Sequence, residues 1–183
     1  MSAPLIVLRE RLDADGGLLA AALRPAADVE AAPAPLGDRV ATGPRAAADP
    51  AAYAFVVEAI REGYLLHCGP AHPARVLDEE DADLALLAGD RLYAVGLQRL
   101  ADLGDLEAVA ALAEVIALSA QARAAGDEEL VSAVWEAGLV QVGWGDHDAL
   151  RAARDAVRAG DPSATHALRA AVEKALVRRP PAG

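Results

Sequence analysis

Three Gly-Asp pairs divide the second half of the chain into short segments. These pairs are Gly104-Asp105, Gly126-Asp127 and Gly160-Asp161. Glycine tolerates the left-handed conformation that ends many helices, and aspartate is a preferred cap for the start of the next helix. The pairs therefore predict a succession of helices. Asp146 is expected to cap a further helix over 146–160. The expected segments are about 79–103, 106–125, 127–143, 146–160 and 162–178.

The first half predicts two helices that are separated by an irregular connection. Residues 3–24 can form one helix, although its glycines weaken it. The pair Asp49-Pro50 supplies a cap and a proline suited to the first helical position, and this helix should run to about Cys68. We expect the Ala/Pro-rich residues 25–48 to form an extended, mobile connection.

The composition favours packed helices over a sheet. Apolar residues make up 54% of the 183 residues and aromatic residues only 3%, and alanine, the best helix former, is abundant. We predict an all-α fold, an antiparallel bundle of about six helices. The expected division is 1–48 for the first helix and connection, 49–178 for the helical domain, and 179–183 for a frayed tail.

Charge and cysteine content limit the classes of partner and compartment. The net charge is −11, so nucleic acid and anionic membrane surfaces should repel the chain. The single Cys68 excludes an intramolecular disulfide. The sequence lacks the layout of a signal peptide and any apolar run long enough to span a bilayer, so we expect a cytoplasmic protein.

Two histidines and the cysteine lie close together where the helix ending near Cys68 meets Gly69-Pro70. His67, Cys68 and His72 are residue types that bind zinc, but their spacing fits no usual zinc pattern. The favoured interpretation is a helix end, with His67 packed on the core and His72 in solvent. His166 is expected on the surface, and Trp135 and Trp144 are expected in the core.

An acidic run, Asp78 to Asp83, is a second place where a metal could bind. Asp78, Asp81 and Asp83 are candidate Mg²⁺ ligands, and Glu79, Asp83 and Asp90 could share one face of the expected helix. The favoured interpretation is again simpler, because acidic residues in a first helical turn stabilise the helix dipole. We expect no cofactor, and Mg²⁺ only if this run forms a site. The motifs of nucleotide-binding loops, zinc proteases and serine hydrolases are missing from the sequence.

Two glycines lie on the apolar stripe of the helix expected over 79–103. Glycine weakens a helix, so Gly89 and Gly96 are best explained by another backbone that comes close. The residues expected to border an apolar tunnel or a subunit interface are Tyr64, Leu86, Gly89, Tyr93, Gly96, Leu97 and Leu100.

Two stretches resemble the trans-isoprenyl diphosphate synthases, or polyprenyl synthetases. "VVEAIREGYLLH" resembles the helix that leads into the first aspartate-rich motif of the family, and "LLAGDRL" resembles the start of its next helix. The matching residues are Val57, Glu58, Ile60, Leu65, Leu66, His67, Leu87, Ala88, Gly89, Asp90 and Leu92. The resemblance covers roughly residues 50–125 and implies a truncated isoprenoid-synthase-like bundle.

The chain departs from this family where the family binds Mg²⁺. The positions of the first aspartates hold Cys68, Gly69 and His72, which cannot replace hard oxygen ligands. The second aspartate-rich motif is absent, and only Arg75 stands near the place of the usual arginine pair. The chain in this respect resembles the non-catalytic small subunits of heterodimeric hexaprenyl and heptaprenyl diphosphate synthases.

The resemblance implies a protein that is not an enzyme on its own. Such a subunit would pair with a catalytic prenyl diphosphate synthase large subunit, or with itself, and would modulate isoprenoid chain elongation. Two alternatives stay open. One is an unrelated all-α interaction module, because Ala/Leu-rich helices match many families by chance. The other is a Mg²⁺-dependent isoprenoid enzyme that uses the acidic run over 78–83.

Overall fold

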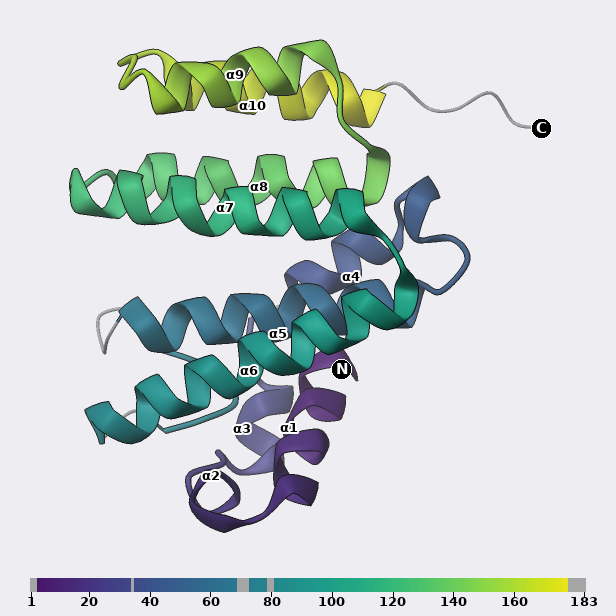
Figure 1. Cartoon of the computed structure of the whole chain (residues 1–183), viewed down its shortest axis with the longest axis vertical. Coiled ribbons are helices and arrows are strands. Elements are labelled where there is room, and N and C mark those ends of the chain that lie inside the picture. The colour runs from purple at the N-terminus through teal and green to yellow at the C-terminus, as the bar shows by residue number, and fades with distance from the viewer. Residues whose placement is uncertain (1–2, 34, 69–72, 79–80, 178–183) are drawn as a thin grey trace. The chain divides into compact units, whose positions relative to one another are not determined.

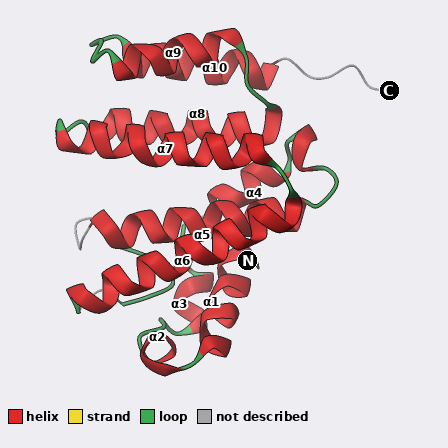
Figure 2. Ribbon diagram, in the orientation of Figure 1, coloured by secondary structure: helices red, strands yellow, loops and turns green. Residues whose placement is uncertain are grey.

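The structure is a computed structural model that describes residues 3–33, 35–68, 73–78 and 81–177 (Figure 1). The described residues are mostly helical, and their one extended pairing is an isolated bridge between Leu23 and Leu77 (Figure 2). The all-α prediction is confirmed. The helices are α1 (Ala3–Asp15), α2 (Gly17–Ala21), α3 (Ala26–Glu30), α4 (Leu36–Ala41), the 3₁₀ helix η1 (Pro44–Ala46), α5 (Pro50–Cys68), α6 (Ala82–Leu103), α7 (Leu106–Ala124), α8 (Glu128–Trp144), α9 (Asp148–Arg158) and α10 (Ala164–Val177).

The long helices predicted after residue 49 are present close to the expected positions. The single helix expected over 3–24 is instead divided into α1 and α2, because Gly16 and Gly17 adopt φ of 73° and 68°. Asp49 caps α5 by accepting a hydrogen bond from the Ala52 N–H, and Pro50 is the first residue of the helix. Gly104 and Gly126 follow α6 and α7 with φ of 66° and 73°. Glycine is therefore required at both turns, as the Gly-Asp pairs predicted.

The region between residues 25 and 48 differs from the expectation. The extended connection predicted there was wrong, because α3, α4 and η1 occupy most of it. Val29 and Val40 of these short helices are fully buried. Tertiary contacts therefore stabilise helices that are too short to be stable alone, and these helices raise the count above the expected six.

The described chain forms two compact units. The first comprises Met1–Ala41 and Asp49–Asp105, and the second comprises Thr42–Ala48 and Leu106–Gly183. This division does not follow the boundary after residue 48 that composition suggested. The tail expected to fray, 179–183, lies outside the described residues.

The first unit is built around α5. This helix is buried on almost every side and packs against α1, α4 and α6. On α1, Leu5, Leu8 and Leu12 recur at helical spacing and are fully buried. Because α5 is covered all round, it forms the core of this unit and positions the elements that surround it.

The antiparallel pair of α5 and α6 has a very close contact (Figure 1). A Cβ atom on Gly63 would lie 3.0 Å from the carbonyl oxygen of Gly89, and one on Gly89 would lie 3.1 Å from that of Gly63. Two backbones can approach this closely only where no side chain intervenes. The inference of a close backbone is confirmed at Gly89. At Gly96 the nearest atoms belong instead to the Ile60 side chain, 2.8 Å from a Cβ atom placed there.

The second unit has α8 as its buried helix, which packs against α7 and α10. Trp135 is buried in it, as expected for a core residue, and His166 is exposed on α10. Trp144, also expected in the core, is only half-buried at the end of α8. The cap of α9 is His147, not Asp146 as predicted, and its Nδ1 accepts a hydrogen bond from the Leu150 N–H at 3.3 Å.

Asp146 is engaged by arginines instead. It accepts hydrogen bonds from Arg151 at 2.9 Å and from Arg154 at 3.1 Å. Burial alone would raise the pKa of Asp146, but the hydrogen bond from Arg151 and the charge of Arg154 together lower it below its usual value. Arg154 also pairs with Glu114 at 2.9 Å, so the cluster joins α9 to α7.

None of the described helices combines the length and the apolar character needed to cross a lipid bilayer.

Replacement of Gly37 by alanine should destabilise the first unit. The new Cβ atom would lie 2.4 Å from the carbonyl oxygen of Ala54, and backbone atoms of α5 cannot move aside cheaply. We expect a loss of about 1–3 kcal/mol in the free energy of unfolding, measured by urea denaturation. The exposed neighbour Asp38→Ala is the control and should cost far less. Equal stability of the two variants would contradict this contact.

Replacement of Asp146 by asparagine should give a stability loss that depends on pH. Because the pKa of Asp146 is lower in the folded protein, its ionised form stabilises the fold. This contribution is fully present at pH values above the unfolded pKa of about 3.8. This stabilisation disappears as the pH falls through the lower folded pKa. At pH 7 we expect a loss of roughly 0.5–1 kcal/mol, shrinking below pH 4, in thermal unfolding followed by circular dichroism. A difference that is constant from pH 7 to pH 3 would show that the charge of Asp146 has no part in it.

Candidate functional site

Residues 56–67 and 86–92, the two stretches on which the expected family resemblance rests, meet at the end of α5. The His67 ring stacks on Tyr93 of α6, with centroids 5.2 Å apart. Its Nδ1 lies 2.8 Å from the Gly63 carbonyl oxygen, and its Nε2 lies 3.2 Å from Asp90 Oδ1. Burial raises the pKa of Tyr93 above its usual value, so this side chain stays neutral. His67 therefore joins the two stretches by direct contact.

The zinc interpretation of residues 67–72 gains no support from these contacts. Both ring nitrogens of His67 face protein oxygens, so metal binding would have to break a contact. Cys68 is a half-buried free thiol at the end of α5. His72 lies outside the described residues. Within the part of the chain that the structure describes, no three His, Cys, Asp or Glu side chains are grouped to share a metal ion.

The acidic run has a local structural role. Asp81 caps α6 and accepts hydrogen bonds from the N–H groups of Asp83 and Leu84 at 3.0 and 3.1 Å. Asp83 lies exposed in the first turn. Asp78 is also exposed, and its N–H donates to the Ala22 carbonyl oxygen at 2.9 Å. These positions fit the interpretation that the acidic residues stabilise a helix start.

The residues expected to line a tunnel or interface divide between two faces. Gly89, Gly96 and Leu100 are buried toward the interior of the first unit, and Tyr64 is buried on α5. Leu86 and Leu97 are exposed at 48% and 51%, and Tyr93 lies half-buried between the faces. Their spacing alone put them on one stripe, but the buried face of α6 is rotated toward Ala85, Ala88 and Leu92.

A buried ionic network that the sequence analysis did not identify lies behind this pair of helices. Glu58 and Glu62, one turn apart on α5, are both fully buried and both pair with Arg75. Arg75 Nε donates to Glu62 at 2.7 Å and Arg75 Nη2 donates to Glu58. The signal was present in the sequence: two glutamates at i and i+4 within an apolar helix require a buried partner.

Backbone groups complete this network. Glu58 accepts from the Gly37 N–H at 2.6 Å, and Glu62 accepts from the N–H groups of Arg75 and Val76 at 2.6 and 3.1 Å. Burial raises the pKa of Glu58, and the charge of Arg75 opposes this effect. Burial would lower the pKa of Arg75, but the two carboxylates outweigh it and raise this pKa. The carboxylates are fully engaged in holding α4 and residues 75–76 against α5.

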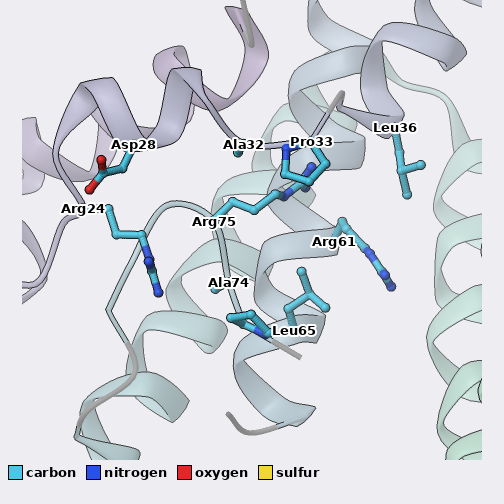
Figure 3. Close-up of a pocket in the computed structure, with 10 residues that line it drawn as sticks. Arg24, Asp28, Ala32, Pro33, Leu36, Arg61, Leu65, Ala74 and Arg75 are labelled. Carbon is cyan, nitrogen blue, oxygen red and sulfur yellow. The ribbon is translucent and has the colours of Figure 1, made fainter. Parts of the chain in front are cut away.

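A cavity of about 560 Å³ lies beside this network, and three arginines line it: Arg24, Arg61 and Arg75 (Figure 3). Arg24 Nε donates to the Leu77 carbonyl oxygen at 3.1 Å, and Arg61 lies over the Tyr64 ring. Burial and the charge of Arg75 lower the pKa of Arg61. Figure 3 shows that the guanidinium groups do not converge on one point. The cavity therefore does not form one small-anion site, and its Arg75 is already paired with Glu58 and Glu62.

No protein-family model, curated protein or solved structure matches this chain.

Replacement of Arg75 by methionine should strongly destabilise the first unit at neutral pH. It leaves two buried carboxylates without their cation, which typically costs about 3–5 kcal/mol. In this variant the charge of Arg75 no longer opposes the effect of burial on Glu58, and only the Gly37 hydrogen bond still does. The folded pKa of Glu58 therefore lies still further above the unfolded value of 4.5. A carboxyl group whose folded pKa is raised stabilises the fold in its protonated form. This contribution is fully present below the unfolded pKa and is lost as the pH rises through the folded pKa, so the variant should become more stable as the pH falls from 7 toward 4.5.

The measurement is urea denaturation between pH 7 and pH 4.5, with the exposed Arg169→Met as control. Arg75→Lys keeps the charge and should fall between the wild type and Arg75→Met. A small loss for Arg75→Met that does not change with pH would show that the network contributes little to stability.

Proposed function

We propose that this protein is a non-catalytic, prenyl-synthase-like helical subunit that pairs with a catalytic prenyl diphosphate synthase and modulates isoprenoid chain elongation. The observation that carries the proposal is the contact of His67 with Asp90 and Tyr93. Each of the two resembling stretches is short, and separate chance matches need not meet in space. Here they lie side by side, backbone to backbone at Gly63 and Gly89.

The proposal assigns the chemistry to the partner. At the positions where the resembling family carries its first aspartates, this sequence has Cys68, Gly69 and His72. Transfer of a prenyl group requires Mg²⁺ to hold the diphosphate and to stabilise its departure, and Mg²⁺ prefers carboxylate oxygens. The partner would supply these ligands, and this chain would supply a surface that shapes or supports the partner's product site.

Two exposed leucines of α6 form the surface that we assign to the partner. Leu86 and Leu97, exposed at 48% and 51%, lie on one side of the helix, whereas the exposed Leu87 lies about 100° around the helix from Leu86, on the side of Arg91. We call Leu86 and Leu97 the outer α6 leucines. Full burial of a leucine side chain contributes about 1.5–3 kcal/mol, so the two can provide a substantial part of the binding energy of an interface.

The first experiment is a pull-down of the tagged chain from its native cell, with the co-purifying proteins identified by mass spectrometry. We expect a prenyl diphosphate synthase that carries both aspartate-rich motifs, in a stoichiometric amount. Assays with and without this chain should then give products of different length. If no such synthase is found, and the purified chain binds none, the alternative of an unrelated all-α interaction module is the better description.

The double variant Leu86→Glu/Leu97→Glu tests where the partner binds. It should abolish co-purification, because it places two charges on the proposed interface. The matched control is Leu106→Glu on α7, which is 79% exposed and outside the outer α6 leucines. Circular dichroism should show that both proteins are folded. Retention of the partner by the double variant would exclude this surface.

A further inference from the structure

A groove on the first unit combines an apolar floor with a cationic rim. It is formed by α1, the beginning of α5 and a side of α6 away from the outer α6 leucines, and its volume is about 630 Å³. This is a usual size for a small-molecule site. The floor consists of Val7, Ala51, Phe55, Ala94 and Val95, and the cationic side chains of the rim are Arg11, Arg91 and Arg99.

Two of the rim arginines are held in place by carboxylates. Arg91 donates to Asp15 Oδ2 from Nε at 2.8 Å and from Nη2 at 2.6 Å. Arg99 donates to Asp49 Oδ2 from Nη2 at 2.8 Å. Each guanidinium group carries five N–H donors, so both side chains are oriented by their aspartates and keep donors for a ligand.

The acidic residues of the groove are already engaged. Asp49 also accepts from the Ala52 N–H at the start of α5, and Asp102 accepts from Gln98 at 3.1 Å. Arg11, in contrast, is exposed on α1 and makes no ion pair or hydrogen bond within the described part of the chain. The rim therefore has one arginine without an ion pair among the described residues, Arg11, while Asp15 and Asp49 pair with the other two.

We propose that this groove binds an anionic amphiphile, a molecule with one apolar chain and a carboxylate or phosphate head. Phe55 and Val7 are incompletely buried, and an apolar chain on the floor would remove them from water. The head would accept hydrogen bonds from the rim, where arginine geometry suits both carboxylate and phosphate.

The acidity of the whole chain does not oppose this binding. Its net charge is −11, but at physiological salt charges further than about 8 Å away are largely screened. Distant acidic residues therefore contribute little, and the head of the ligand would meet the Arg11 guanidinium and the remaining N–H donors of Arg91 and Arg99. The site does not depend on the proposed pairing with a synthase, since all its residues come from the first unit.

The probe is an undecanoic acid with a dansyl group, whose fluorescence rises when it enters an apolar site. We expect saturable binding of one probe per chain. Dodecanoate and dodecyl phosphate should both displace it, and their relative strengths show which head the rim prefers. A neutral dodecyl maltoside and a cationic dodecyltrimethylammonium salt, both below their micelle concentrations, should not displace it. Absence of saturable binding overturns the proposal, as does equal displacement by the neutral and cationic compounds.

Variants then locate the site. Arg11→Gln should weaken binding about tenfold, the effect of losing one hydrogen bond to a charged group, and Arg11→Lys should recover part of it. Val7→Asp puts a charge on the floor and should abolish binding of the probe while circular dichroism is unchanged. Lys174→Gln removes one positive charge on α10, outside the groove, and is the control. Equal affinities of the Arg11→Gln and Lys174→Gln variants overturn the assignment to this groove.

Discussion

The first unit depends on the two ion pairs that Arg75 forms with the buried carboxylates of Glu58 and Glu62. Two charges inside the central helix are costly to bury, and they are tolerated because a cation and backbone donors satisfy them. The same contacts hold residues 73–77 against α5. The carbonyl oxygen of Leu77 then accepts from Arg24, and the carbonyl oxygen of Arg24 accepts from Arg9 of α1. A series of hydrogen bonds thus links the centre of the unit to α1, in addition to the apolar contacts of α1 with α5.

The helix α6 has three faces with different roles. One face lies backbone to backbone on α5 at Gly63 and Gly89, and it carries the contact of His67 with Asp90. A second exposes the outer α6 leucines, which we assign to a protein partner. A third lines the groove with α1 and contributes Arg91 and Arg99. Because the glycine contact brings α6 unusually close to α5, it also sets where the other two faces lie, so a single packing event positions both proposed binding surfaces.

Sequence signals identified the long helices but not the short ones. The caps at Asp49 and Asp127 and the glycine turns are local features, and local features determine where long helices begin and end. The helices α3 and α4 were missed because nothing local stabilises five or six residues as a helix. α4 is held by the Gly37 N–H on Glu58, a contact between residues far apart in the chain. The cap of α9 was wrongly assigned to Asp146 because the sequence does not show that Arg151 and Arg154 engage this carboxylate, which leaves the helix start to His147.

The sequence by itself determined that the chain is helical, where its long helices end, and that one of them packs closely through glycine. These properties depend on backbone preferences and on periodicity within a few turns. Only the tertiary structure decided that Leu86 and Leu97 face outward while Leu100 faces inward, because the rotation of α6 is set by its contact with α5. It also decided the partner of Glu58 and Glu62, and it brought the arginines of two helices to one groove. Such pairings join residues distant in the chain, and no local pattern encodes which distant surface a helix will meet.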